Sequence, residues 1–158
     1  MRPEAFTLYG DRLMSSIIYP LSMRQSYKLC LDYRLLCQQA NVRALWDTGA
    51  TGSCVSQGLA RRLGLKTIDM CPVCGVGGTT LSPVYSIDIL LPSNVEIPNL
   101  RVTEFMDNGS FEVIIGMDVM TLGDFAISNS GGKTTVSFRI PPSDSPVDFV
   151  KQIEPQSK

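Results

Sequence analysis

The stretch A-L-W-D-T-G-A-T-G-S-C-V-S, residues 44–56, is the place where an apolar run ends abruptly in an aspartate. Asp, Thr and Gly are common turn residues, so the triplet alone predicts only a turn after a buried strand. However, an ionised carboxylate at the end of a buried strand costs free energy unless it shares a proton with another group or accepts hydrogen bonds. The small residues that follow allow the backbone to approach a partner or a substrate closely. The stretch is therefore either an ordinary turn or the site of a carboxylate with a chemical role.

The sequence on both sides of this stretch is typical of β-strands. Apolar and polar residues alternate with a period of two in three segments, 85–92, 99–103 and 134–141. Two near-continuous apolar runs, 42–46 and 112–116, are typical of strands that are buried on both faces. Turn-forming residues separate the strands at 75–78, 92–94, 107–110 and 129–133. The regular spacing predicts a small all-β domain of the meander or barrel type.

One or two short helices are expected within this domain. Residues 56–64 predict a helix with Ser56 as the N-cap and Gly64 as the C-cap. A second helix is expected to begin near Asp118, because an acid is favoured at a helix N-terminus, and to end at Gly123. The proline-containing residues 143–158 are expected to form a C-terminal tail, in which 148–153 forms a helical turn or docks as a strand.

Composition narrows the range of functions. The chain has 158 residues, which suits a single domain, and its net charge of −1 gives no electrostatic basis for binding nucleic acid or an anionic membrane. The N-terminus lacks the apolar core of a signal peptide, and the five cysteines have no regular spacing, so a cytoplasmic location is expected. There is no histidine, which excludes His-based triads and His zinc ligands. Hydrolytic chemistry would have to use carboxylates, thiols or amines.

Three motifs together resemble those of the retropepsin-like aspartic proteases. They are D-T-G-A (47–50), the glycine-rich G-V-G-G (75–78) and I-I-G-M-D (114–118), and they occur in the order and at the rough separations of that family. The resemblance covers about residues 42–125, and residues 123–129 and 137–141 are similar to the closing strands of stand-alone bacterial members. It implies a retropepsin-like closed β-barrel over 1–142, with residues 1–41 carrying no recognised motif and supplying outer and dimer strands.

The resemblance also implies a role for each matching residue. Asp47 would be the catalytic carboxylate, Thr48 would bind the partner chain, and Gly49 would offer its carbonyl to the substrate backbone. Ala50 and Gly116 would support the active site, with Gly116 packed closely under the aspartate turn. The remaining matches would contact substrate: Thr51, Gly52, Gly75, Val76, Gly77 and Ile114. Retroviral members often carry acids where this chain has Thr51 and Gly52, so the resemblance implies the chemistry but not the substrate side-chain preference.

Peptide hydrolysis by carboxylates needs two of them, one to accept a proton from water and one to donate a proton to the carbonyl oxygen. No other aspartate in the chain is followed by Thr-Gly or Ser-Gly. If the chemistry operates, a twofold homodimer must bring Asp47 to its copy on a second chain. The expected function is that of an aspartic endopeptidase acting on extended polypeptides, with no cofactor and no metal.

Two other interpretations stay open at this stage. The same fold could serve as a non-catalytic peptide-binding or dimerisation module. Alternatively, C-P-V-C (71–74) could hold zinc or form a redox-active disulfide at the base of the glycine-rich hairpin. A structural zinc needs four ligands, and the chain has no second C-x-x-C and no histidine, which disfavours a zinc site.

Overall fold

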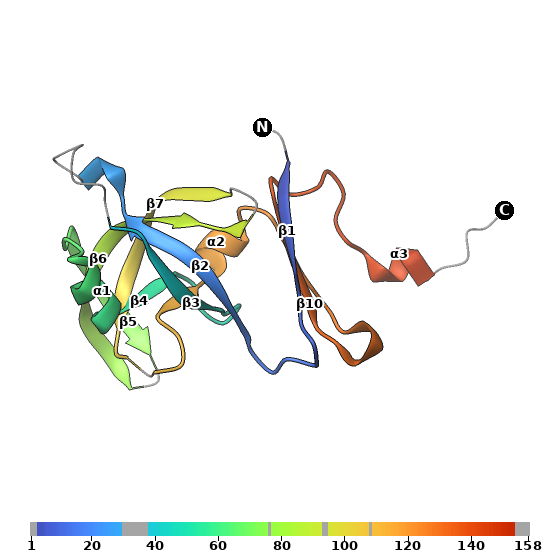
Figure 1. The fold of residues 1–158 in the computed structure, drawn as a ribbon, viewed down its shortest axis with the longest axis horizontal. Helices are drawn as coiled ribbons and strands as arrows, with labels where there is room; N and C mark the ends of the chain where they lie inside the picture. The colour runs from blue at the N-terminus through green and yellow to red at the C-terminus, as the bar shows by residue number, and fades with distance from the viewer. Residues whose placement is uncertain (1–2, 30–37, 76, 93–94, 108, 154–158) are drawn as a thin grey trace.

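A computed structural model describes residues 3–29, 38–75, 77–92, 95–107 and 109–153; Cys30, Cys37 and Val76 lie outside the described residues. Six strands form a hydrogen-bonded ring in the order β2-β3-β8-β4-β7-β6, and a further pairing of β6 with β2 closes it. Their bounds are β2 Ile17–Gln25, β3 Ala40–Trp46, β4 Cys54–Ser56, β6 Gly78–Leu90, β7 Glu96–Phe105 and β8 Val113–Ile115. The predicted all-β closed barrel is therefore confirmed (Figure 1).

The glycine-rich segment forms the end of a hairpin, as its sequence predicts. Strand β5 (Asp69–Gly75) pairs antiparallel with the first half of β6, and Gly75 lies opposite Gly78 at the tip. Gly78 has a φ of 108°, a backbone conformation that residues with a Cβ rarely adopt. The hairpin extends the sheet beyond the closed ring of strands.

The first predicted helix is confirmed and the second is shorter than expected. Helix α1 spans Gln57–Leu63; the Ser56 side chain accepts a hydrogen bond from the Leu59 amide, and Gly64 ends the helix with a φ of 59°. Helix α2 spans only Met117–Met120, with Gly116 as its N-cap. A third helix, α3 (Phe149–Ile153), lies in the predicted tail. Two 3-10 turns lie at Tyr27–Leu29 and Ser130–Gly132.

A separate three-stranded sheet is built from both ends of the chain. Strand β10 (Thr135–Ile140) pairs with β1 (Glu4–Tyr9) on one side and β9 (Asp124–Ser128) on the other. Four aromatic rings join this sheet to the barrel: Trp46 stacks on Phe125 at a centroid distance of 5.2 Å, and it also contacts Phe6 and Phe138. Trp46 is thus a core residue at the seam between the two sheets.

Strand β3 is buried on one face only, which corrects the prediction for residues 42–46. Val42, Ala44 and Trp46 are buried, whereas Arg43 is exposed and Leu45 is half-buried. The same holds for β8, in which Ile114 is half-buried between two buried neighbours. The sequence pattern resembled that of a fully buried strand because Leu45 and Ile114, on the outer face, are also apolar.

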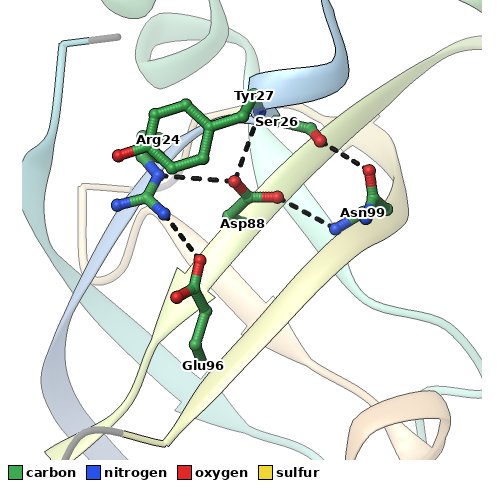
Figure 2. A network of polar contacts seen from close by, with 6 residues as sticks. All are labelled: Arg24, Ser26, Tyr27, Asp88, Glu96 and Asn99. Atoms are coloured by element: carbon green, nitrogen blue, oxygen red, sulfur yellow. Dashed lines mark hydrogen bonds and ion pairs between the residues drawn. The ribbon is translucent and has the colours of Figure 1, made fainter. Parts of the chain in front are cut away.

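The barrel is closed at the β2–β6 junction by a polar network (Figure 2). Arg24 on β2 donates to the Asp88 carboxylate on β6 at 3.3 Å and to Glu96 on β7 at 2.6 Å, and both Arg24 and Asp88 are buried. The Asp88 carboxylate also accepts hydrogen bonds from the Tyr27 and Asn99 amides. The Arg24 guanidinium lies 3.8 Å from the centre of the Tyr27 ring, which completes its surroundings. In the β2–β3 register, Ile17 lies opposite Trp46, so Arg24 and the end of β3 lie at opposite ends of β2.

Candidate active site

Asp47 directly follows β3, and its backbone and side chain are both held in place. Its amide donates to the Ile115 carbonyl at 3.0 Å, which continues the parallel pairing of β3 with β8 by one residue. One carboxylate oxygen, Oδ1, accepts a hydrogen bond from the Gly49 amide at 2.9 Å. The other, Oδ2, accepts none from the described residues. Asp47 as a residue is half-buried, with one carboxylate oxygen oriented by the turn and the other without a hydrogen bond from the described residues.

The aspartate turn, residues 47–53, packs directly on the start of α2. The Met117 amide donates to the Ala50 carbonyl at 2.9 Å, and the Asp118 amide donates to the Thr51 carbonyl at 3.2 Å. A Cβ added at Gly116 would lie 2.7 Å from the carbonyl carbon of Gly52 and 2.9 Å from the Ala50 oxygen. Because both of these contacts are backbone atoms, only glycine fits at position 116 without moving the turn.

The buried Ser53 and the half-buried Asp118 connect the turn to the helix. The Ser53 hydroxyl donates to Asp118 Oδ1 at 2.7 Å and accepts from the Gly116 amide at 3.0 Å. The Ser53 amide donates to Asp118 Oδ2 at 2.9 Å. Asp118 also accepts from the Val119 amide and lies in the first turn of α2, where an acid was expected, but the N-cap of the helix is Gly116 and not Asp118. The cross-link to Ser53 is a second role, which the sequence reasoning missed.

A row of half-buried side chains crosses the outer face of the barrel next to the aspartate turn. Strand register places Leu45 opposite Ile114, Ile114 opposite Cys54, and Cys54 opposite Thr103. The Cys54 sulphur lies 3.2 Å from the Thr103 hydroxyl, and burial raises the pKa of this thiol, which keeps it protonated. We call Leu45, Ile114, Cys54 and Thr103 the outer-face row. It is a largely apolar surface that includes the predicted substrate-contacting residue Ile114.

Segments from both ends of the chain adjoin Asp47. A hollow of about 340 Å³ is lined by the residues Met14, Ser15, Ser16, Ile17, Leu45, Trp46, Asp47, Ile127 and Asn129. A second hollow of about 530 Å³ follows the connection between β1 and β2 and shares Met14, Ser15 and Ser16 with the first. Residues 14–16 carry no motif, and residues 127 and 129 are matched only to a closing strand, so the sequence does not place either segment at the site.

The other predicted site residues are distributed over two elements. Thr48, Gly49, Thr51 and Gly52 are exposed on the aspartate turn. Gly75 and Gly77 are exposed at the hairpin tip, and Val76 lies outside the described residues. The structure thus brings the turn, Ile114 and Gly116 together, and it places the glycine-rich residues on a separate hairpin.

The C-P-V-C pair is not arranged as a metal or disulfide site. Cys71 and Cys74 are three residues apart on β5, where successive side chains alternate, so they lie on opposite faces, and both thiols are free. Cys74 is exposed and approaches Thr79 rather than Cys71. No group of three or more potential metal ligands occurs among the described residues. In the same part of the chain, no helix has the length and apolar character needed to cross a membrane.

Comparison with known proteins identifies the family. Residues 35–121 match the model of the family described as "gag-polyprotein putative aspartyl protease", which is more than half of the chain. The chain belongs to this aspartyl protease family. The match contains the aspartate turn, the hairpin and the Ile114–Gly116 segment, so all three motifs fall within it. No relative among the curated proteins gives a significant match.

A solved structure of another protein supports the retropepsin-like fold. The protein is similar to a retropepsin-like aspartic protease from Rickettsia conorii, with 11% sequence identity and a TM-score of 0.50 over 88% of this chain and 96% of that one. It also matches the retroviral protease-like domain of Ddi1 from Leishmania major, with 18% identity and a TM-score of 0.44 over 80% and 96% of the two chains. At this identity, the Rickettsia structure indicates a shared fold and nothing finer.

Proposed function

We propose that this aspartyl protease family member is an active homodimeric endopeptidase that cleaves extended polypeptides with a water molecule held between two Asp47 side chains. The observation that carries the proposal is the geometry of Asp47. Its carboxylate sits at the end of a buried strand, with one oxygen fixed by the Gly49 amide and the other unpaired among the described residues. A carboxylate held in this way can bind and activate water.

The chemistry requires a second carboxylate, which a twofold axis would supply. Two carboxylates about 3 Å apart share one proton and their pKa values separate, as is established for aspartic proteases. The ionised member takes a proton from water as the water attacks the peptide carbonyl, and the protonated member donates to the carbonyl oxygen. Among the described residues, no other carboxylate hydrogen-bonds to Asp47, so the partner group must come from elsewhere.

Two features of the single chain support the dimer. Thr48, next to Asp47, is exposed and free to bind a second copy. The hollow beside Asp47 is lined partly by Ile127, an exposed apolar residue that a partner could cover. Ile127 lies on β9, an edge strand of the three-stranded sheet, and an uncovered edge strand is a ready surface for association.

The remaining matching residues would then bind the substrate. An extended peptide would lie along the aspartate turn, where Gly49, Thr51 and Gly52 are exposed. Ile114 and its neighbours in the outer-face row would contact apolar side chains of the substrate. The hairpin tip, residues 75–77, would close over the peptide as a flap and exclude water. We assign these functions to residues 1–142 and regard residues 143–158 as a tail.

The alternative is a non-catalytic peptide-binding module on the same fold. The retained Asp47 carboxylate favours the protease, since peptide binding alone does not need a charged group at the end of a buried strand. The two functions differ in a simple assay, because only the protease releases new peptide termini.

Cleavage of unfolded casein, followed from acid to neutral pH, tests the proposal. We expect a bell-shaped rate profile in the acid to mildly acid range, because one carboxylate of the pair must be ionised and the other protonated. A statine-type inhibitor is expected to stop the reaction, and Asp47→Asn is expected to reduce the rate by about 10³-fold or more. The matched control is Asp69→Asn, which removes an exposed carboxylate paired with Arg101 and should leave the rate unchanged.

Cleavage that persists in Asp47→Asn would overturn the mechanism. A folded, dimeric wild-type protein that binds casein without cleaving it at any pH would favour the binding module.

A further inference from the structure

The C-terminal segment, residues 141–153, presents apolar side chains that nothing in the described part of the chain covers. Phe149, Val150 and Ile153 in α3 are 68%, 66% and 81% exposed, and Val147 is also exposed. Figure 1 shows α3 set apart from the barrel, beyond the three-stranded sheet. The segment is attached at its base, where the Ser143 amide donates to the Asp124 carboxylate at 2.7 Å. Four exposed apolar residues within seven positions form a surface of the kind that binds a partner.

The helical form of this segment is held only by local contacts. Helix α3 has five residues, and its cap is the Asp148 carboxylate, which accepts from the Val150 and Lys151 amides. Isolated helices shorter than about 12–15 residues are marginal in water. The segment can therefore extend at little cost. Once extended, it would project Val147 and Phe149 to one side and Val150 to the other.

The surface around Asp47 offers a complementary partner for such an extended peptide. The outer-face row supplies half-buried Leu45 and Ile114, and the adjoining hollow adds the exposed Ile127. Charge is also complementary. Arg12 is exposed on the connecting hollow and makes no ion pair among the described residues. The C-terminal segment carries two acids, Asp144, which is likewise unpaired within the described chain, and Asp148.

We propose that the C-terminal segment of one copy occupies the Asp47 cleft of another copy as an extended peptide and competes there with substrate. Val147, Phe149 and Val150 contact the apolar lining, and an acidic residue of the segment lies toward Arg12. The proposal rests on the proposed function for the identity of the cleft as the substrate site. It predicts that the protein restrains its own activity as its concentration rises.

Binding of a labelled peptide measures this contact without any need for catalysis. The probe is a fluorescent peptide of residues 143–153, and the receptor is the full chain carrying Asp47→Asn together with Phe149→Ser, Val150→Ser and Ile153→Ser, so that its own tails do not compete. We expect saturable binding that weakens about tenfold or more when the same three serines are placed in the peptide. Arg12→Glu in the receptor should weaken binding about threefold, whereas the control Lys66→Glu should not.

A photo-crosslinking residue in place of Phe149 in the peptide locates the contact. Cross-links to the outer-face row or to residues around Asp47 are expected, and cross-links confined to other surfaces would overturn the proposal, as would an absence of saturable binding. In the active protein, the three-serine variant should lose the fall in specific activity at high concentration. A restraint that does not depend on protein concentration would mean that each chain occupies its own cleft, which also contradicts the proposal.

The two proposals fail separately. Casein cleavage without peptide binding would remove the tail contact and leave the protease intact. Peptide binding at the cleft without casein cleavage would remove the protease and leave a binding module.

Discussion

The Ser53 side chain helps to fix the geometry of the candidate site. Its hydroxyl is buried, donates to Asp118 and accepts from the Gly116 amide, and so connects the aspartate turn, the end of β8 and the start of α2. Because Gly116 packs against the backbone of the same turn, the position of Asp47 depends on these contacts as well as on β3.

Replacing Ser53 with alanine tests this role. The substitution leaves the buried Gly116 amide without its acceptor, and a buried unsatisfied donor costs about 1–3 kcal/mol. We expect the free energy of unfolding in urea to fall by that amount. Ser128→Ala, which alters an exposed serine on β9, is the control and should change it by less than about 0.5 kcal/mol. Equal stability of Ser53→Ala and wild type would show that the hydroxyl does not anchor the turn.

At the residue scale, the sequence predicted the motif residues but not the contact between Ser53 and Asp118 that holds them in place. Asp47, Ile114 and Gly116 stand in recognisable patterns, and the structure brings them to one place. Ser53 follows the first motif by three residues and Asp118 ends the third, but their pairing joins residues 65 positions apart. Sequence periodicity reports which face of an element is buried; it does not report which side chains meet across elements.

At the scale of elements, the junction between β2 and β6 combines strand pairing with a buried ion pair. The β2–β6 pairing closes the ring, and Arg24 and Asp88 are both buried there. The Asp88 carboxylate receives donors from Arg24, the Tyr27 amide and the Asn99 amide, which satisfies its charge inside the protein. Such a fully paired network is stable, but it is costly to break on one side.

Asp88→Asn is therefore expected to lower the free energy of unfolding by about 3–5 kcal/mol. The substitution leaves the charge of Arg24 only partly compensated. It also replaces one of the two carboxylate oxygens that accept hydrogen bonds from backbone amides with an NH₂ group, which cannot accept them. The measurement is chemical denaturation monitored by tryptophan fluorescence, as Trp46 lies at the seam of the two sheets. Glu96→Gln, at the exposed side of the same network, is the control and should cost less than about 1 kcal/mol. A small effect of Asp88→Asn would mean that backbone pairing alone closes the barrel.

Element-scale prediction succeeded where one local signal dominated. The caps of α1 and the turn at Gly78 follow directly from Ser56, Gly64 and the glycine-rich sequence. The expectation that β3 is buried on both faces was wrong. Leu45 is apolar, but it lies on the outer face that borders the candidate site and does not pack into the core. The closing network was out of reach, since Arg24 and Asp88 are 64 positions apart and each resembles an ordinary surface charge.

At the scale of the whole molecule, the proposed chemistry needs a second copy of the chain. The barrel, the aspartate turn and the three-stranded sheet are complete within one chain, but the proposed chemistry is not, because one chain carries one Asp-Thr-Gly. The family match fixes the class of protein, and the dimer would supply the missing carboxylate.

Mixing wild-type protein with Asp47→Asn protein tests this claim most directly. If only a dimer with two Asp47 carboxylates is active and chains exchange freely, a fixed amount of wild type should fall to about half its activity with one equivalent of the variant and to about a tenth with nine equivalents. Asp69→Asn protein, added in the same amounts as a control, should contribute its own activity without such inhibition. Casein cleavage by the wild type that stays constant as Asp47→Asn protein is added, under conditions in which the chains are shown to exchange, would contradict the paired-aspartate account.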